Sequence, residues 1–184
     1  MNNLEGKKVA ILTEDGFEEL ELTSPKAVLE DAGAQVDIVS PQTENVTGWS
    51  EGDWSDKFTV DVEVSEADPD DYDALMIPGG VINPDKMRRN QYCIDFAKAF
   101  MEDDKPIASI CHGPQLLIET GMLKGKNLTS FNSIKTDLLN AGANWQNKEV
   151  VTDQGLVTSR SPEDLQPFNN KMIEEFNEGI HKNR

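Results

Sequence analysis

Short apolar runs separated by helical stretches constrain the fold of this chain more than any other feature. Residues 7–13 (KKVAILT) and 35–40 (QVDIVS) carry several Val and Ile side chains, and the segment between them predicts a helix. Runs that are apolar along most of their length are typical of strands in a parallel sheet covered on both faces. A strand–helix–strand opening of this kind connects through a right-handed crossover. We therefore predict an α/β sandwich built on a parallel sheet.

The remaining segments continue this alternation. Further strands are predicted at residues 74–77, 107–110, 127–130, 149–152 and 156–158. Further helices are predicted at residues 90–102, 113–120, 134–140 and 162–180. The first helix is expected to begin at Thr23 or Ser24, with Pro25 in its first turn. Neither a repeat nor a linker interrupts the 184 residues, and a domain has about 150, so we expect a single domain.

Two segments depart from the buried pattern. Residues 43–56 are polar and turn-rich. Residues 57–64 (KFTVDVEV) alternate between apolar and polar side chains, which predicts a half-exposed antiparallel strand. We therefore expect this strand to lie at an edge of the sheet.

The charge of the chain excludes several classes of partner. It has 34 acidic and 17 basic side chains, a formal net charge of −17. Binding to nucleic acid or to anionic lipid requires clustered Lys and Arg. Two cysteines are too few for a disulfide framework, and neither a signal peptide nor an apolar run of about 20 residues is present. We expect a cytoplasmic protein that binds neither nucleic acid nor membrane.

The strongest chemical signal surrounds Cys111. An apolar strand leads directly to Cys111, which is followed by His112, Gly113, Pro114 and a predicted helix. This is the layout of a nucleophile elbow, in which the reactive side chain occupies a tight strand-to-helix turn. The N-terminus of a helix favours a thiolate, and its free N–H groups can bind an oxyanion. We predict that Cys111 is a nucleophile with a lowered pKa; the alternative is a buried structural cysteine.

Neighbouring residues can assist such a nucleophile. His112 can serve as a general base or orient the substrate, or it can merely cap the helix. Gly80, at the end of a buried strand, can add its N–H to that of His112 in an oxyanion hole, because ligands bind beyond the carboxyl ends of parallel strands. Glu18 lies at the same edge, but among five acids in eight residues nothing singles it out. The other histidine, His181, is expected in a frayed C-terminus.

Four segments in the same order resemble the PfpI family of intracellular cysteine proteases. They are DGFEELE at 15–21, PGG at 78–80, ASICHGP at 108–114 and SRSPEDL at 159–165. This family belongs to the class I glutamine-amidotransferase-like superfamily, which includes the parkinsonism-linked DJ-one protein. The resemblance implies a flavodoxin-like three-layer sandwich, with a mostly parallel sheet, helices on both faces and a small antiparallel edge. Residues 1–184 are then one PfpI-like domain.

The resemblance also implies roles for particular residues. Cys111 is the nucleophile, and Glu18 matches a buried, protonated glutamate that is hydrogen-bonded to the sulfur. His112 follows the nucleophile, and Asp85 from a neighbouring subunit completes a Cys–His–acid triad in a position where the family often has Glu. The predicted oxyanion and substrate-binding residues are Gly79, Gly80 and Gly113. Such proteins are homodimers or hexamers, so we expect one of these assemblies.

Two departures from the family pattern affect the predicted mouth of the site. Phe131 stands where relatives tend to have Tyr, so a hydroxyl is missing. The stretch from Trp49 to Trp54 is longer than in compact relatives and is expected to shape either the mouth of the site or an interface.

Three functions follow from the reactive cysteine together with what the resemblance implies. The first is a stress-response enzyme that uses Cys111, without cofactor, on small carbonyl compounds, in the manner of a glyoxalase or deglycase. The alternative is an intracellular cysteine peptidase or amidase acting on short peptides, and the second alternative is a redox sensor or stress-binding protein. No zinc-ligand spacing and no phosphate-binding loop are present, so we expect neither a metal nor a cofactor. Cys93 is expected to be packing, and Arg160 is expected to pair with Asp164.

Overall fold

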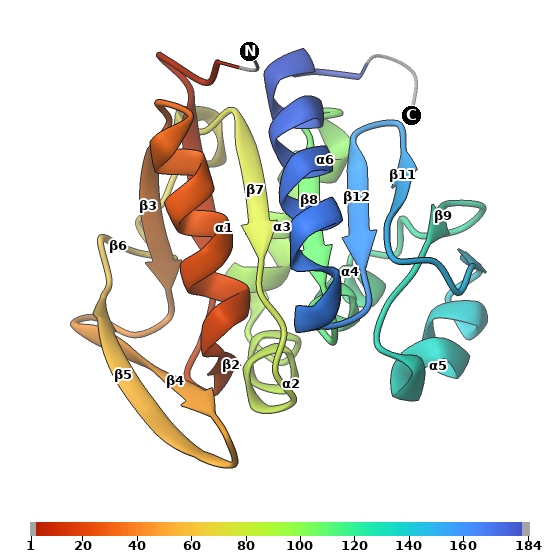
Figure 1. The fold of residues 1–184 in the computed structure, drawn as a ribbon, viewed down its shortest axis with the longest axis horizontal. Coiled ribbons are helices and arrows are strands. Elements are labelled where there is room, and N and C mark those ends of the chain that lie inside the picture. Colours follow the sequence, from red (N-terminus) through yellow and green to blue (C-terminus); the bar gives the residue numbers. More distant parts are fainter. Residues whose placement is uncertain (1–2, 182–184) are drawn as a thin grey trace.

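A seven-stranded sheet forms the centre of the protein in the computed structural model, which describes residues 3–181 (Figure 1). The strand order is β11-β12-β8-β7-β1-β3-β6. These strands are β1 (Lys8–Leu12), β3 (Gln35–Ser40), β6 (Val62–Glu63), β7 (Ala74–Ile77), β8 (Ile107–Ile110), β11 (Val151–Asp153) and β12 (Leu156–Ser159). All neighbours pair in parallel except β11 and β12. The predicted parallel sheet with a small antiparallel edge is confirmed.

Helices cover both faces of this sheet, which confirms the three-layer sandwich (Figure 1). One face carries α1 (Glu19–Asp31) and α6 (Leu165–Glu178). The other carries α2 (Ile82–Met87), α3 (Gln91–Glu102) and α4 (Pro114–Glu119), and α5 (Lys135–Asn140) lies beside it. Short 3-10 turns occur at Pro69–Asp71, Asn132–Ile134 and Pro162–Asp164. A separate buried apolar cluster fills the space between each helical layer and the sheet.

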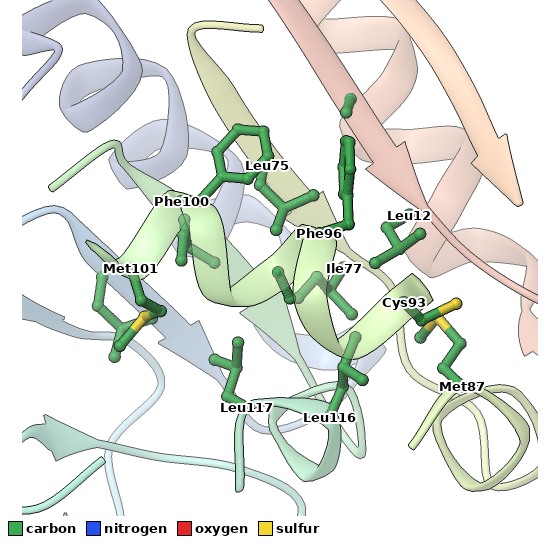
Figure 2. Close-up of a cluster of buried hydrophobic side chains, with 14 of the residues drawn as sticks. Leu12, Leu75, Ile77, Met87, Cys93, Phe96, Phe100, Met101, Leu116 and Leu117 are labelled. Carbon is green, nitrogen blue, oxygen red and sulfur yellow. The ribbon is translucent and has the colours of Figure 1, made fainter. Parts of the chain in front are cut away.

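The cluster under α3 shows how the apolar strands and helices meet. Phe96 and Phe100 of α3 pack in the same cluster as Leu75 and Ile77 of β7 (Figure 2). Cys93 lies in this cluster with no exposed surface, and burial raises its pKa to about 12. The prediction that Cys93 is a packing residue is therefore confirmed.

The segment between β3 and β7 differs from the prediction. The strands β4 (Asn45–Ser50) and β5 (Asp53–Thr59) form an antiparallel hairpin, and β2 (Phe17–Glu18) pairs with β4. The predicted single strand over residues 57–64 is wrong. The chain leaves the hairpin at Asp61, whose carboxylate accepts the N–H of Ile38 at 2.7 Å, and continues as β6, parallel to β3. A pair of two-residue strands, β9 (Asn127–Leu128) and β10 (Asn144–Trp145), completes the structure.

The first helix also begins earlier than predicted. It starts at Glu19, directly after β2, and Pro25 lies inside it. Pro25 lacks an N–H, so it cannot bond to the carbonyl of Glu21. The Thr23 hydroxyl donates to the carbonyl of Glu19 in the first turn at 3.0 Å. The early start places Glu21 within the helix, fully buried beside Leu22.

The strands of the parallel part all point in one direction, toward the lower edge in Figure 1. At this edge lie the hairpin β4–β5, α2 and the start of α6. Ligand sites of open parallel sheets lie at such an edge. Among residues 3–181, no helix is both long enough and apolar enough to cross a membrane.

Candidate active site

Cys111 occupies a strained turn between β8 and α4. Its φ is +61°, a left-handed conformation that residues other than glycine seldom adopt. Two backbone hydrogen bonds hold it there: its N–H donates to Ser159 at 3.0 Å, and its carbonyl accepts from Phe131 at 2.9 Å. A Cβ on Gly113 would lie 2.8 Å from the Ile77 carbonyl oxygen, so a larger residue would displace the turn. The predicted strand–turn–helix geometry is present.

The carboxyl group that faces the sulfur belongs to Glu21, and the prediction that Glu18 does so is wrong. Glu21 has no exposed surface, interacts with the Cys111 thiol, and accepts the N–H of Gly79 at 2.9 Å through Oε2. Glu18 lies at the end of β2 and is half-buried at the wall of the pocket. The reason is the early start of α1: Glu21 lies on its inner face, whereas Glu18 precedes the helix.

Glu21 and Cys111 share one buried site for negative charge. Burial raises the pKa of Glu21 to about 8, so its carboxyl is protonated at neutral pH. Burial also raises the pKa of the Cys111 thiol, and the Glu21 charge raises it further, while the N–H groups of Gly80 and His112 act in the opposite direction. The expected lowering of the Cys111 pKa is therefore not found. Because two adjacent like charges are unfavourable, ionisation of either group disfavours ionisation of the other.

His112 is oriented by contacts on three sides. Its Nδ1 lies 3.2 Å from the Cys111 sulfur, and its Nε2 lies 2.9 Å from the Ser133 hydroxyl oxygen. The ring stacks on Phe131 with centroids 4.8 Å apart. Burial lowers the pKa of His112, so the imidazole is neutral at pH 7. With the proton on Nε2 donated to Ser133, the Nδ1 lone pair faces the thiol.

The Gly79–Gly80 turn brings a backbone N–H to the sulfur. Gly80 has a φ of +81°, and its N–H and that of His112 both donate to the Cys111 sulfur. A Cβ on Gly79 would lie 2.7 Å from the Cβ of Cys111, so only glycine allows this approach.

The side chain of Asn83 holds the Gly79–Gly80 turn in place, a role that the sequence did not predict. It is fully buried in α2, and its Nδ2 donates to the carbonyls of Pro78 and Gly79, each at 3.0 Å. Its Oδ1 accepts the N–H of Glu14 at 2.7 Å, in the loop after β1. One amide side chain thus joins the two loops that form the floor of the site.

The sulfur lies at the base of a pocket of about 440 Å³. Its wall is mostly apolar and contains Gly16, Trp49, Val81, Ile82, Phe131 and Pro162. Trp49 packs edge-to-face on Trp54 with ring centroids 5.3 Å apart, so the hairpin β4–β5 forms part of the mouth. The pocket therefore fits a small molecule that has an apolar portion against the wall and an electrophilic carbon next to the sulfur.

The loop before α6 is held by the predicted pair of Arg160 and Asp164. Arg160 Nε donates to Asp164 Oδ2 at 2.8 Å, and Arg160 Nη2 donates to Asp164 Oδ1 at 3.0 Å. The two residues therefore form a bidentate ion pair. Pro162, between them, lines the pocket. This prediction is confirmed.

Asp85 does not reach Cys111 or His112 within the described chain. It lies on α2 with its side chain exposed, outside the pocket wall. Its role through a neighbouring subunit stays a prediction.

The sequence did not predict roles for Glu21, Asn83 and Ser133, because no motif or spacing around them points directly to the site. Glu21 precedes Leu22, Pro25 and Leu29 on the buried face of α1, a spacing that would have identified it had the helix start been placed at Glu19. Asn83 and Ser133 carry no local signal, since Asn83 joins its turn to Glu14, 69 residues away in sequence, and Ser133 contacts His112, 21 residues away.

Comparison with known proteins finds a family whose sequence pattern this chain matches, together with relatives of similar sequence and solved structures of similar fold. The model of the DJ-1/PfpI family matches residues 7–175. A Bacillus subtilis (strain 168) protein named "Putative cysteine protease YraA" is 45% identical over 168 residues, which cover 91% of this chain and 96% of that protein. Drosophila melanogaster DJ-1beta superposes with a TM-score of 0.81 at 29% identity, over 92% of this chain and 90% of that one.

A second solved structure is longer than this chain. It is a two-domain protein from Anabaena variabilis with DJ-1/ThiJ/PfpI-like and ferritin-like domains. It superposes with a TM-score of 0.86 at 40% identity, over 91% of this chain and 47% of its own. This chain therefore spans about half the length of that protein.

Proposed function

Because the chain belongs to the DJ-1/PfpI family, we propose that it is a cysteine enzyme that converts small α-oxoaldehydes, such as methylglyoxal, to 2-hydroxy acids without a cofactor. One observation carries the proposal: the Cys111 sulfur meets a carboxyl, an imidazole and two N–H donors at the base of an apolar pocket of about 440 Å³. A nucleophile, proton carriers and an oxyanion site are the groups that carbonyl chemistry requires. The same chemistry would act on adducts of such aldehydes with amines, which is the deglycase form of the proposal.

In the first step the Cys111 sulfur attacks the aldehyde carbon, and the carbonyl electrons move to the oxygen. The product is a hemithioacetal, and the N–H groups of Gly80 and His112 lie beside the sulfur to stabilise the developing charge. Nδ1 of His112, at 3.2 Å, takes the thiol proton. Since Ser133 holds the opposite nitrogen, it is a positioning residue for this transfer.

In the second step a proton leaves the former aldehyde carbon and is returned to the neighbouring carbonyl carbon, while the proton of the hemithioacetal hydroxyl passes to the neighbouring oxygen. Glu21 is suited to this transfer because its pKa of about 8 leaves a fraction of it ionised near neutral pH: the carboxylate form accepts the proton, and the acid form then returns it. The result is a thioester of the hydroxy acid. Water then attacks the thioester, releases the acid and restores the thiol, so that one aldehyde and one water give one hydroxy acid.

The test measures lactate formed from methylglyoxal in the absence of glutathione. We expect turnover in the wild type, none in Cys111→Ser, and a loss of at least about 10²-fold in Glu21→Gln, the magnitude of general acid–base catalysis. Glu18→Gln is the matched control, since it makes the same change at the pocket wall, and should retain activity within about threefold. Equal losses in Glu18→Gln and Glu21→Gln, or no lactate from the wild type, would contradict the proposal.

A cysteine peptidase acting on short peptides is the second candidate. The Cys–His pair at 3.2 Å and the name of the Bacillus subtilis relative, "Putative cysteine protease YraA", favour it. In this reaction the sulfur forms an acyl-enzyme with the peptide carbonyl and the amine leaves. Cleavage of fluorogenic tripeptides by the wild type, lost in Cys111→Ser, together with no lactate from methylglyoxal, would favour the peptidase. A thiol that alkylates rapidly but supports neither reaction would favour the redox-sensor alternative.

We also propose a homodimer or hexamer in which Asp85 approaches His112 of a second copy. Its support is the exposure of Asp85 on α2 and of Val81, the residue that precedes α2 at the pocket; Val81 is 66% exposed. Light scattering gives the assembly, and Asp85→Asn should lower kcat/KM about tenfold if the carboxylate contacts the imidazole. A monomer, or an Asp85→Asn variant with unchanged kinetics, would exclude this role.

A further inference from the structure

His181 is folded back onto the protein and does not lie in the frayed end that the sequence predicts. Its N–H donates to the carbonyl of Asp104 at 3.0 Å. The turn that allows this is Gly179, whose φ of +81° ends α6 and redirects the chain. The imidazole thereby returns to the last turns of α6, where Glu175 and Glu178 lie.

These three side chains bring their donor atoms together. His181 Nε2 lies 3.2 Å from Glu175 Oε2 and 3.9 Å from Glu178 Oε2. All three donor atoms lie within 4.8 Å of one another. Ligands bound at about 2.0–2.2 Å to one zinc ion are about 3–3.5 Å apart, so a small movement of Glu178 suffices for all three to bind one cation.

A second observation points to a ligand between them. Glu175 is 7% exposed, yet its Oε2 has no hydrogen-bond partner among the described residues, and neither has His181 Nε2. The two atoms face each other at 3.2 Å without hydrogen-bond geometry, so each of these two buried atoms lacks a hydrogen bond. A cation between them would satisfy both. The Gly155 backbone holds Glu175 in place.

We propose that Glu175, Glu178 and His181 form a binding site for one divalent transition-metal ion, with zinc the best match. A mixed set of one imidazole and two carboxylates suits zinc, and exposed Glu178 leaves room for water as a fourth ligand. The site lies at the end of α6 far from Cys111, since α6 begins beside the pocket and its 14 residues extend for about 21 Å. The ion therefore has a structural role: it ties His181, whose N–H bonds to the carbonyl of Asp104, to the last turns of α6 and stabilises this end of the fold.

The test uses the untagged full-length chain with Cys111→Ser as background, because the thiol would otherwise compete for zinc. Calorimetric titration with zinc chloride should give one ion per chain. Glu175→Gln and His181→Gln should each weaken binding at least about tenfold. Glu174→Gln, an equal charge change on the same helix turn at a residue paired with Lys171, is the matched control and should bind as the background does.

Cobalt(II) gives an independent readout, because its visible absorption reports the ligands. We expect bands of a nitrogen–oxygen site that are absent in His181→Gln, and a thermal midpoint that zinc raises in the background protein but not in that variant. The absence of zinc binding, equal binding by all variants, or a thiolate-to-cobalt band from Cys93 would overturn the proposal. None of these readouts depends on enzymatic activity, so the result is separate from that of the proposed function.

Discussion

The two cysteines of this protein are both buried, but the groups that surround their sulfur atoms differ. Cys93 lies inside α3 among apolar side chains with no exposed surface, whereas Cys111 is 7% exposed, at the base of a pocket. Burial raises the pKa of each thiol. Cys111 differs in its positive φ and in the N–H groups, imidazole and carboxyl that surround its sulfur. Burial alone gives an inert thiol, and polar groups held by the fold distinguish the candidate nucleophile.

The largest expected difference between the cysteines is in reactivity. Cys111→Ser should abolish thiol alkylation by iodoacetamide in the folded protein and lower turnover by at least about 10³-fold, since the nucleophile itself is lost. Cys93→Ala is the matched control and should leave both unchanged. Mass spectrometry after a timed alkylation identifies the modified residue. Modification of Cys93 at a rate similar to that of Cys111 would remove the distinction.

The second prediction concerns the carboxyl beside Cys111. The folded pKa of Glu21, about 8, lies above the value of 4.5 for an unperturbed carboxyl, so the folded state retains the proton between these two values. Its contribution to stability is therefore complete below pH 4.5 and declines as the pH rises toward 8, by up to about 1.4 kcal/mol per pH unit.

Urea unfolding at pH 5.5 and pH 8 measures this decline. The wild type should lose more stability across this interval than Glu21→Gln, which cannot ionise. The difference between the two proteins in how the free energy of unfolding changes with pH reports Glu21 alone. Other groups whose pKa is raised, such as Glu175, are present in both proteins. Identical slopes would mean that Glu21 does not hold a proton near neutral pH.

The third prediction tests how His112 is oriented. Ser133→Ala removes the hydroxyl that contacts Nε2, and the loss of one hydrogen bond of about 1 kcal/mol should lower kcat/KM about fivefold. The pH profile should also shift, since the tautomer with a free Nδ1 is no longer favoured. An unchanged profile with unchanged KM and kcat would show that Ser133 has no positioning role.

The smallest effect is expected at the packing cysteine. Cys93→Ala removes one buried sulfur from the α3 cluster and should lower the free energy of unfolding by about 1–2 kcal/mol, with no change in activity. Chemical denaturation checks the first expectation and the lactate assay the second. A loss of activity larger than the loss of folded protein would link this cluster to the site.

The sequence by itself determined the alternation of buried strands and helices, because apolar runs such as Ile107–Ile110 can be satisfied only inside a covered parallel sheet. It also determined the elbow at Cys111 and the Arg160–Asp164 pair, because both depend on neighbours within a few positions in the chain. These features are local, so spacing alone reveals them.

Only the tertiary structure decided which groups meet the sulfur and which meet His181. Glu21 was chosen over Glu18 by the starting point of α1, and Ser133 reaches His112 from a separate loop. At the other end of α6, Gly179 turns the chain so that His181 returns to Glu175. Such contacts depend on the exact phase of a helix and on the packing of distant segments, and neither is encoded in local spacing.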